Sequence, residues 1–220
     1  RIIIARHGNT FNKGDIITRV GARTDLPLTE TERGTNVGRY LKDRNLIPAK
    51  AFAAPLKRTV ETAKLAIEAM GCTIPLELDE SFREVDYGPD ENKPEEEVIA
   101  RIGQDALDKW NKDAIVPDGW KFEPQAIINN WLLWGEKAFK NFHNETILIV
   151  SSNGIIRFSP YLTGNFAEFT KEHAIMTATS EKDGSFSFAK VPYGQWIVRE
   201  IEAPTGFVLD DTSYEVNISK

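Results

Sequence analysis

Short apolar runs alternate with amphipathic stretches over the first three quarters of the chain. Each run has four to six residues, which is typical of a buried strand and too short for an ordinary helix. The predicted strands are Ile2–Ala5, Ala51–Ala54, Ile74–Leu78 and Thr146–Ser151. Strands that alternate with helical stretches favour a largely parallel sheet with helices packed on its faces. The pattern therefore predicts an α/β fold.

Two helices are expected between the first and third strands. Thr29, with Glu32 three residues later, is placed for a capping box at the start of the first helix. The second helix opens at Pro55, carries Arg58 in its first turn and ends at Gly71, a residue favoured just after a helix C-terminus.

Two further helices are expected before the last apolar run. One begins at Pro94, has an acidic first turn and buries a stripe of Val98, Ile102, Ala106 and Trp110. The other covers about Gln125–Phe142 and buries Ile128, Trp131, Leu132, Ala138 and Phe142. We interpret these stripes as parts of the hydrophobic core.

Residues suited to phosphate chemistry follow the predicted strands. Arg6 and His7 come directly after the first strand, and Gly8 permits a sharp turn there. A guanidinium can bind two phosphate oxygens, and a neutral imidazole nitrogen can attack phosphorus. Arg58, at a helix start, and Glu84, after the third strand, could add a phosphate ligand and an acid. Alternatively, His7 is a hydrogen-bonded structural residue, Arg58 a surface arginine, and Glu84 part of a solvated loop.

Composition excludes several classes of protein. The net charge of −6, without a block of Lys or Arg, argues against a general nucleic-acid binder or a membrane-surface binder. No apolar segment is long enough to span a bilayer, and the absence of a signal peptide favours the cytoplasm. The single cysteine, Cys72, excludes an internal disulfide and a cysteine-based zinc site, and we expect it to be buried.

Five ordered motifs connect these stretches to a known family. They are Arg6–Thr10 with Asn12, Asp25–Thr29, Pro55–Ala63, Phe82–Gly88 and Ser151–Arg157. Together they make about residues 1–176 resemble the histidine phosphatase superfamily, the phosphoglycerate-mutase-like proteins. The resemblance implies a three-layer fold with helices on both faces of the sheet.

The resemblance also implies a reaction and its residues. A phosphoryl group would pass through a phosphohistidine on His7, with Arg6, Asn12 and Arg58 binding its oxygens and Glu84 protonating the leaving group. No cofactor and no metal are expected. The expected partner is a small phosphorylated substrate, and the short chain favours a phosphatase over a mutase.

One motif departs from the family at a position that matters chemically. The family usually has a second histidine where this chain has Asn153. An asparagine keeps a hydrogen-bond donor for phosphate but cannot carry a positive charge. We therefore expect Asn153 to take part in the site and to leave the enzyme impaired.

From about Thr177 the pattern changes to strands and turns. Residues 177–220 resemble part of a Cna B-type domain of cell-surface adhesins and pilins, and predict a small all-β segment with strands that include Ser185–Phe188, Trp196–Ile201 and Tyr214–Ile218. The exposed edges of an incomplete sandwich would pack on the first domain, pair with another chain or self-associate.

Two functions are compatible with this sequence. One is a phosphomonoester hydrolase weakened by Asn153. The other is a weak or inactive chimera, or a binding or structural protein whose β tail pairs with a partner.

Overall fold

A computed structural model of the protein describes residues 1–163, 188, 194–199 and 213–218. The chain divides into two units, Arg1–Leu162 and Thr163–Lys220. The expected boundary between residues 176 and 177 lies outside the described residues. No helix in the described ranges is long and apolar enough to cross a membrane.

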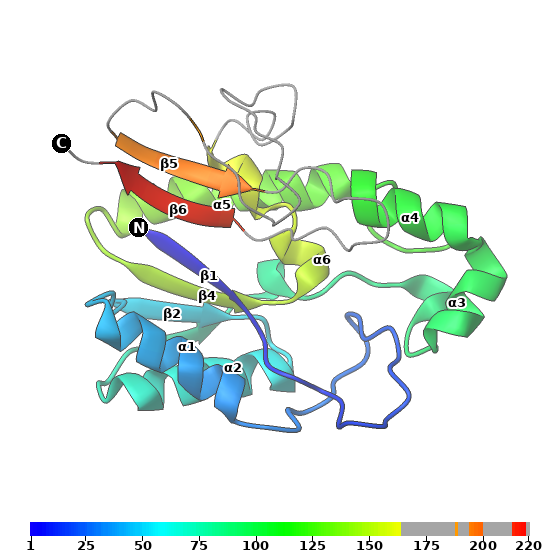
Figure 1. The fold of residues 1–220 in the computed structure, drawn as a ribbon, viewed down its shortest axis with the longest axis horizontal. Helices are drawn as coiled ribbons and strands as arrows, with labels where there is room; N and C mark the ends of the chain where they lie inside the picture. Colours follow the sequence, from blue (N-terminus) through cyan, green and yellow to red (C-terminus); the bar gives the residue numbers. More distant parts are fainter. Residues whose placement is uncertain (164–187, 189–193, 200–212, 219–220) are drawn as a thin grey trace. The chain divides into compact units, whose positions relative to one another are not determined.

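The first unit is built on a four-stranded parallel sheet (Figure 1). Its strands are β1 (Ile2–Arg6), β2 (Lys50–Ala53), β3 (Leu76–Leu78) and β4 (Ile147–Ser151), in the order β1-β4-β2-β3. Arg6 lies opposite Ser151, and Ala53 lies opposite Val150. The carboxyl ends of β1, β4 and β2 therefore meet at one edge, where ligands bind in open α/β sheets. All four predicted strands are confirmed, the third in shortened form.

Helices cover both faces of the sheet, as expected. The helices of the unit are α1 (Glu32–Asp43), α2 (Lys57–Met70), α3 (Glu95–Ile102), α4 (Gln104–Asp113), α5 (Pro124–Asn141) and α6 (Asn153–Ile156). Short 3-10 helices occupy Glu80–Phe82, Gly88–Asp90 and Ser159–Thr163. In Figure 1, α1 and α2 lie on one face and α5 on the other, so the unit has three layers.

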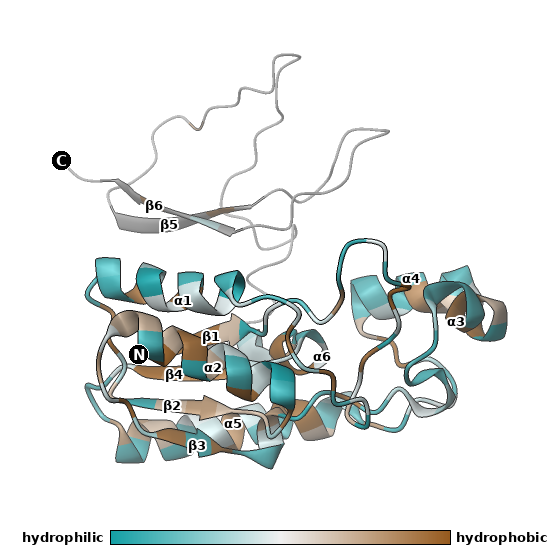
Figure 2. Ribbon diagram, turned by 90° about the horizontal axis from the view of Figure 1, so that it is seen from below, coloured by the Kyte–Doolittle hydropathy of each residue, from teal (hydrophilic) through white to brown (hydrophobic). Residues whose placement is uncertain are grey.

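Alternate residues of β4 explain this layering. Leu148 and Val150 join the hydrophobic cluster that contains residues of α1 and α2, whereas Ile147 and Ile149 join the cluster that contains residues of α5. Successive side chains of a strand point to opposite faces, so a fully buried strand needs cover on both. Figure 2 shows the matching pattern, with hydrophobic strands and a largely hydrophilic α1.

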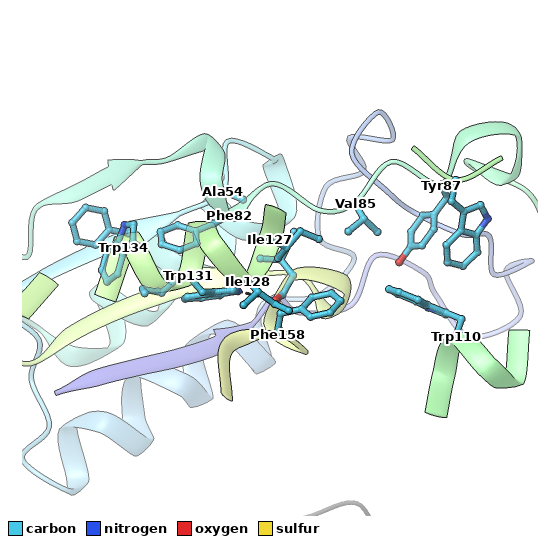
Figure 3. Close-up of a cluster of buried hydrophobic side chains, with 14 of the residues drawn as sticks. Ala54, Phe82, Val85, Tyr87, Trp110, Ile127, Ile128, Trp131, Trp134 and Phe158 are labelled. Atoms are coloured by element: carbon cyan, nitrogen blue, oxygen red, sulfur yellow. Dashed lines mark hydrogen bonds between the residues drawn. The ribbon is translucent and has the colours of Figure 1, made fainter. Parts of the chain in front are cut away.

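Aromatic side chains form the core on the α5 face (Figure 3). The ring centroid of Phe82 lies 5.3 Å from that of Trp131 and 5.2 Å from that of Trp134. The indole N–H of Trp131 donates to the carbonyl of Ile155 over 2.9 Å. This core therefore supports the segment before Glu84 and the turn that follows β4.

The predicted capping box at Thr29 is wrong. Helix α1 begins at Glu32, and the Thr29 hydroxyl instead donates to the carbonyl oxygens of Asn9 and Phe11. Glu30 acts near the helix start, because its carboxylate accepts the backbone N–H of Arg33 over 3.0 Å. Thr29 thus holds the loop after His7 rather than the helix.

The single helix predicted from Pro94 is also wrong. Gly103, with φ of +82°, separates α3 from α4, in a conformation that glycine adopts without a steric penalty. Leu132, expected in the core, is 41% exposed on α5, and Cys72 is exposed rather than buried. The strongest part of the predicted α5 stripe, including Trp131, is buried.

The described part of the second unit is a pair of strands. β5 (Gly194–Arg199) and β6 (Ser213–Ile218) are antiparallel, with Gly194 opposite Ile218. β6 confirms the predicted strand at Tyr214–Ile218. β5 confirms the strand predicted at Trp196–Ile201 as far as Arg199, and residues 200 and 201 lie outside the described residues. Apart from Phe188, the predicted strand at Ser185–Phe188 lies outside the described residues.

Candidate active site at the carboxyl edge of the sheet

His7 lies directly beyond β1 with a defined tautomer. Its backbone N–H donates to the carbonyl of Ser151 over 3.1 Å, and its Nδ1 lies 2.7 Å from the carbonyl oxygen of Gly8. A carbonyl can only accept, so Nδ1 carries the hydrogen and Nε2 keeps its lone pair. Burial lowers the pKa of His7 from 6.5 to about 4, helped by the charges of Arg58 and Arg6 and opposed by the Gly8 hydrogen bond. At neutral pH, Nε2 is therefore uncharged and has the lone pair that a nucleophile needs.

Arg58 is fully buried, at 0% exposure, in the first turn of α2. Nη1 donates to the carbonyl of Thr24 over 2.8 Å and Nη2 to that of Gly21 over 3.2 Å, while Nε has no partner within the described part of the chain. Burial lowers the pKa of Arg58, and the negative charge of Glu84 opposes this effect. The interpretation of Arg58 as a surface arginine is therefore wrong.

Glu84 is buried beside the turn after β4. Its carboxylate accepts the backbone N–H of Val85 over 2.9 Å and that of Gly154 over 3.2 Å. Burial raises the pKa of Glu84, and the two hydrogen bonds and the charges of Arg58 and Arg6 oppose the rise. A carboxyl with a raised pKa holds its proton to higher pH, as a general acid must. Glu84 is thus not part of a solvated loop.

The geometry links these residues, which lie at or after the ends of four different strands. The charges of Arg58 and Arg6 act on both His7 and Glu84. Arg6 is the exposed last residue of β1. Asn153 is exposed at the start of α6, next to the Gly154 N–H that binds Glu84. The structure therefore brings these five residues to one edge of the sheet.

Asn12 is the predicted site residue that the described contacts do not link to this cluster. Its side-chain amide is exposed and donates to the carboxylate of Asp15 over 3.3 Å. Its backbone N–H donates to the same carboxylate over 2.7 Å. Asn12 therefore stabilises the turn at the start of the long loop.

Three neighbours of the site were not singled out from the sequence, namely Thr62, Arg157 and Tyr87. Thr62 is fully buried one helical turn after Arg58, and its spacing of four residues in a predicted helix is the signal that could have found it. Arg157 lies with its guanidinium carbon 4.0 Å from the Trp110 ring centroid. Burial lowers the pKa of Arg157, and electrostatic interactions with Tyr87 and Glu84 oppose the effect. Figure 3 shows Tyr87 beside Trp110 in this region.

The described residues contain no group of three or more His, Cys, Asp or Glu side chains able to hold a metal ion. A groove of about 380 Å³ lies between the loop at Leu28–Thr31 and α2. Its lining includes Glu30, Glu61, Lys64 and Glu68. The groove does not include His7, Arg58 or Glu84 in its lining.

Two family models match the chain. The model described as the histidine phosphatase superfamily (branch 1) matches residues 2–180, and the SpaA model, described as a prealbumin-like fold domain, matches residues 151–220. The two matches overlap, so they do not define a boundary between the units.

Curated relatives match about half of the chain. The 2,3-bisphosphoglycerate-dependent phosphoglycerate mutase of Bifidobacterium longum (strain DJO10A) is 29% identical over 124 residues, which are 53% of this chain and 48% of the relative. The protein of the same name from Streptococcus equi subsp. zooepidemicus (strain MGCS10565) is 28% identical over 122 residues, or 54% of this chain and 52% of the relative. The chain spans about half the length of the curated relatives it matches.

Solved structures share the fold. The alpha-ribazole phosphatase from Shigella flexneri superposes with a TM-score of 0.56 and 21% identity, covering 70% of this chain and 75% of the other. YhfR of Bacillus stearothermophilus superposes with a TM-score of 0.62 and 22% identity, covering 86% and 94%. Identities this low show the common fold alone.

Proposed function

The chain belongs to the histidine phosphatase superfamily (branch 1), and from this membership we propose that it hydrolyses small phosphomonoesters through a phosphohistidine on His7. One observation carries the proposal: a neutral imidazole with a free Nε2 lies within the electrostatic reach of Arg58 and Arg6, whose charges also act on the buried carboxyl group of Glu84. Phosphoryl transfer needs a positioned nucleophile, cations for the phosphoryl oxygens and a proton for the leaving group.

Substrate binding would use the guanidinium groups of Arg58 and Arg6. Two N–H groups of Arg58 already bind backbone carbonyls, which fixes the plane of its guanidinium. Its buried Nε–H has no partner among the described residues, and it would bind a phosphoryl oxygen once the chain around it opened to admit the substrate. Arg6, exposed at the rim, would complete the binding of the phosphoryl group. Asn12 would contribute only if it left its contact with Asp15.

In the first chemical step, Nε2 of His7 attacks phosphorus and the bond to the ester oxygen breaks. Protonated Glu84 gives its proton to that oxygen, and the alcohol leaves. In the second step, Glu84, now a carboxylate, takes a proton from water as the water oxygen attacks phosphorus. The P–N bond breaks, inorganic phosphate leaves, and His7 and Glu84 return to their starting protonation states.

Asn153 would donate a neutral hydrogen bond to the phosphoryl group. A protonated histidine at this position would add a positive charge to the hydrogen bond with the charged phosphoryl group, and charge-assisted hydrogen bonds are the stronger kind. A gain of about 1.4 kcal/mol in the transition state corresponds to a tenfold rate. We therefore expect Asn153→His to raise kcat about tenfold, and an unchanged or lower kcat would contradict this role for Asn153.

A chromogenic phosphate ester tests the proposed activity. Wild type should release phosphate, and His7→Ala should reduce the rate to background because it removes the nucleophile. His143→Ala is the matched control, since His143 is an exposed histidine after α5. Equal phosphate release by wild type and His7→Ala would refute the proposal.

A second candidate function is a non-catalytic protein that pairs through its C-terminal unit. It is favoured by the match of residues 151–220 to the prealbumin-like domain and by the antiparallel pair β5–β6. Self-association through this unit would give a dimer or larger species in size-exclusion chromatography with light scattering, and a strictly monomeric chain would exclude it. The cytoplasmic location of the phosphatase-like part and the cell-surface origin of the tail stay predictions.

A further inference from the structure

One buried hydroxyl connects the turn that carries His7 with the helix that carries Arg58. The side-chain oxygen of Thr62 accepts the backbone N–H of Gly8 over 3.0 Å and donates to the carbonyl of Arg58 over 2.6 Å. Thr62 is 0% exposed, so water does not compete for either hydrogen bond. The bond to Gly8 joins residues that are 54 positions apart in the sequence.

Gly8 is held at both of its polar backbone groups. Its N–H binds Thr62, and its carbonyl oxygen accepts the hydrogen on Nδ1 of His7. The carbonyl thereby selects the tautomer in which Nε2 is free. The orientation of Gly8 consequently controls which nitrogen of His7 can attack phosphorus.

We propose that Thr62 is a positioning residue, which fixes Gly8 and through it the tautomer of His7 and the place of His7 relative to Arg58. This inference deepens the proposed function and rests on it for its effect on catalysis. A reacting atom displaced by about 1 Å can slow a reaction by about a hundredfold. A hydroxyl that ties the nucleophile's turn to the phosphate-binding helix is placed to prevent such a displacement.

The other contacts of this turn do not replace Thr62. The backbone N–H of His7 binds Ser151, and that of Asn9 binds the carboxylate of Glu30 over a longer 3.3 Å. Neither bond reaches Gly8 or α2. Without the Thr62 hydroxyl, the buried N–H of Gly8 would lose its partner, and Gly8 would reorient to find another.

Variants of Thr62 and of a neighbouring threonine isolate this role. Thr62→Val keeps the shape and removes the hydroxyl, Thr62→Ala is a second variant without it, and Thr62→Ser restores it. Thr59→Val is the matched control, because Thr59 is equally buried in α2 and its hydroxyl binds only the carbonyls of Ala54 and Leu56. Circular dichroism confirms that each full-length variant folds.

Nitrogen-15 NMR of labelled histidine reads the tautomer directly, with the His7 signals assigned from their loss in His7→Gln. Wild type, Thr62→Ser and Thr59→Val should show His7 protonated on Nδ1 alone at pH 7. Thr62→Val and Thr62→Ala should show a population protonated on Nε2, and a kcat reduced about ten- to hundredfold relative to Thr59→Val.

The tautomer of His7 is the measurement that tests the positioning role of Thr62. That role is overturned if His7 keeps the wild-type tautomer in every folded variant without the Thr62 hydroxyl, or if Thr59→Val changes the tautomer equally. Failure of the proposed function looks different, because wild type itself would then show no turnover that depends on His7. The NMR comparison still tests the positioning role in that case.

Discussion

The low pKa of His7 predicts a specific dependence of stability on pH. Burial holds the imidazole neutral in the folded protein down to about pH 4, whereas an exposed histidine binds a proton near pH 6.5. Between these values the unfolded chain binds a proton that the folded chain does not. The contribution of His7 is therefore fully present above pH 6.5 and is lost as the pH falls towards 4.

The size of the effect follows from the difference between the two pKa values. A change from 6.5 to about 4 corresponds to about 3 kcal/mol of unfolding free energy in full. About 2 kcal/mol of it should be lost by pH 5. This is a large share of the total stability of a typical domain, about 5–15 kcal/mol.

Urea unfolding of wild type and His7→Asn at pH 7, 6 and 5 isolates this contribution. Asparagine keeps an amide donor for the Gly8 carbonyl but does not titrate, so the carboxylates cancel when the two proteins are compared. Relative to the variant, wild type should lose about 2 kcal/mol between pH 7 and pH 5. His143→Asn, at an exposed position, is the control for the loss of a histidine. Parallel curves for wild type and His7→Asn would refute the argument.

Three further predictions test the acid, the anion site and the core. Glu84→Gln should lower kcat/KM, which reports formation of the phosphoenzyme, about 10²- to 10⁴-fold for alkyl phosphates but little for p-nitrophenyl phosphate, because p-nitrophenolate leaves without a proton; an equal loss of kcat/KM on both esters would exclude Glu84 as the acid. Arg58→Lys removes the planar guanidinium and should weaken vanadate binding about ten- to hundredfold by titration calorimetry, and unchanged affinity would place the anion elsewhere. Trp131→Ala, at a 2% exposed position, should cost about 3–5 kcal/mol in urea unfolding, and a cost below about 1 kcal/mol would contradict its place in the core.

The layered fold could be predicted from the sequence because its signals are local. A five-residue strand such as β4, buried along its whole length, is visible as a continuous apolar run. Gly71 ends α2 in the left-handed conformation that was expected of it. In each case the residues that define the element are neighbours in the chain.

The errors arose where distant contacts decide the outcome. Thr29 has the right spacing for a cap, but the carbonyls of Asn9 and Phe11 compete for its hydroxyl, and only the tertiary structure brings them close. Gly103 was compatible with a continuous helix, yet its positive φ ends α3. Local patterns do not distinguish these alternatives.

In the candidate site, too, local signals could be predicted from the sequence and distant contacts could not. The positions of His7 and Arg58 after strands suggested one edge of the sheet, and the parallel order of the strands confirms that edge. The burial of Glu84 could not be predicted, because it depends on Gly154, which is 70 residues away and whose N–H binds the carboxylate. A Cβ at Gly154 would collide with that carboxylate, which explains the need for glycine. The charge state and the solvent access of such a side chain are set by contacts that form only in the folded protein.

The most direct test of the account is to trap the phosphorylated enzyme. Turnover is quenched rapidly, the protein is digested under alkaline conditions, and the peptides are analysed by mass spectrometry. The peptide that contains His7 should carry one acid-labile phosphoryl group. The group should be absent from His7→Ala and should form more slowly in Glu84→Gln with an alkyl phosphate. Turnover that depends on His7 without any phosphoryl group on that residue would contradict the covalent mechanism.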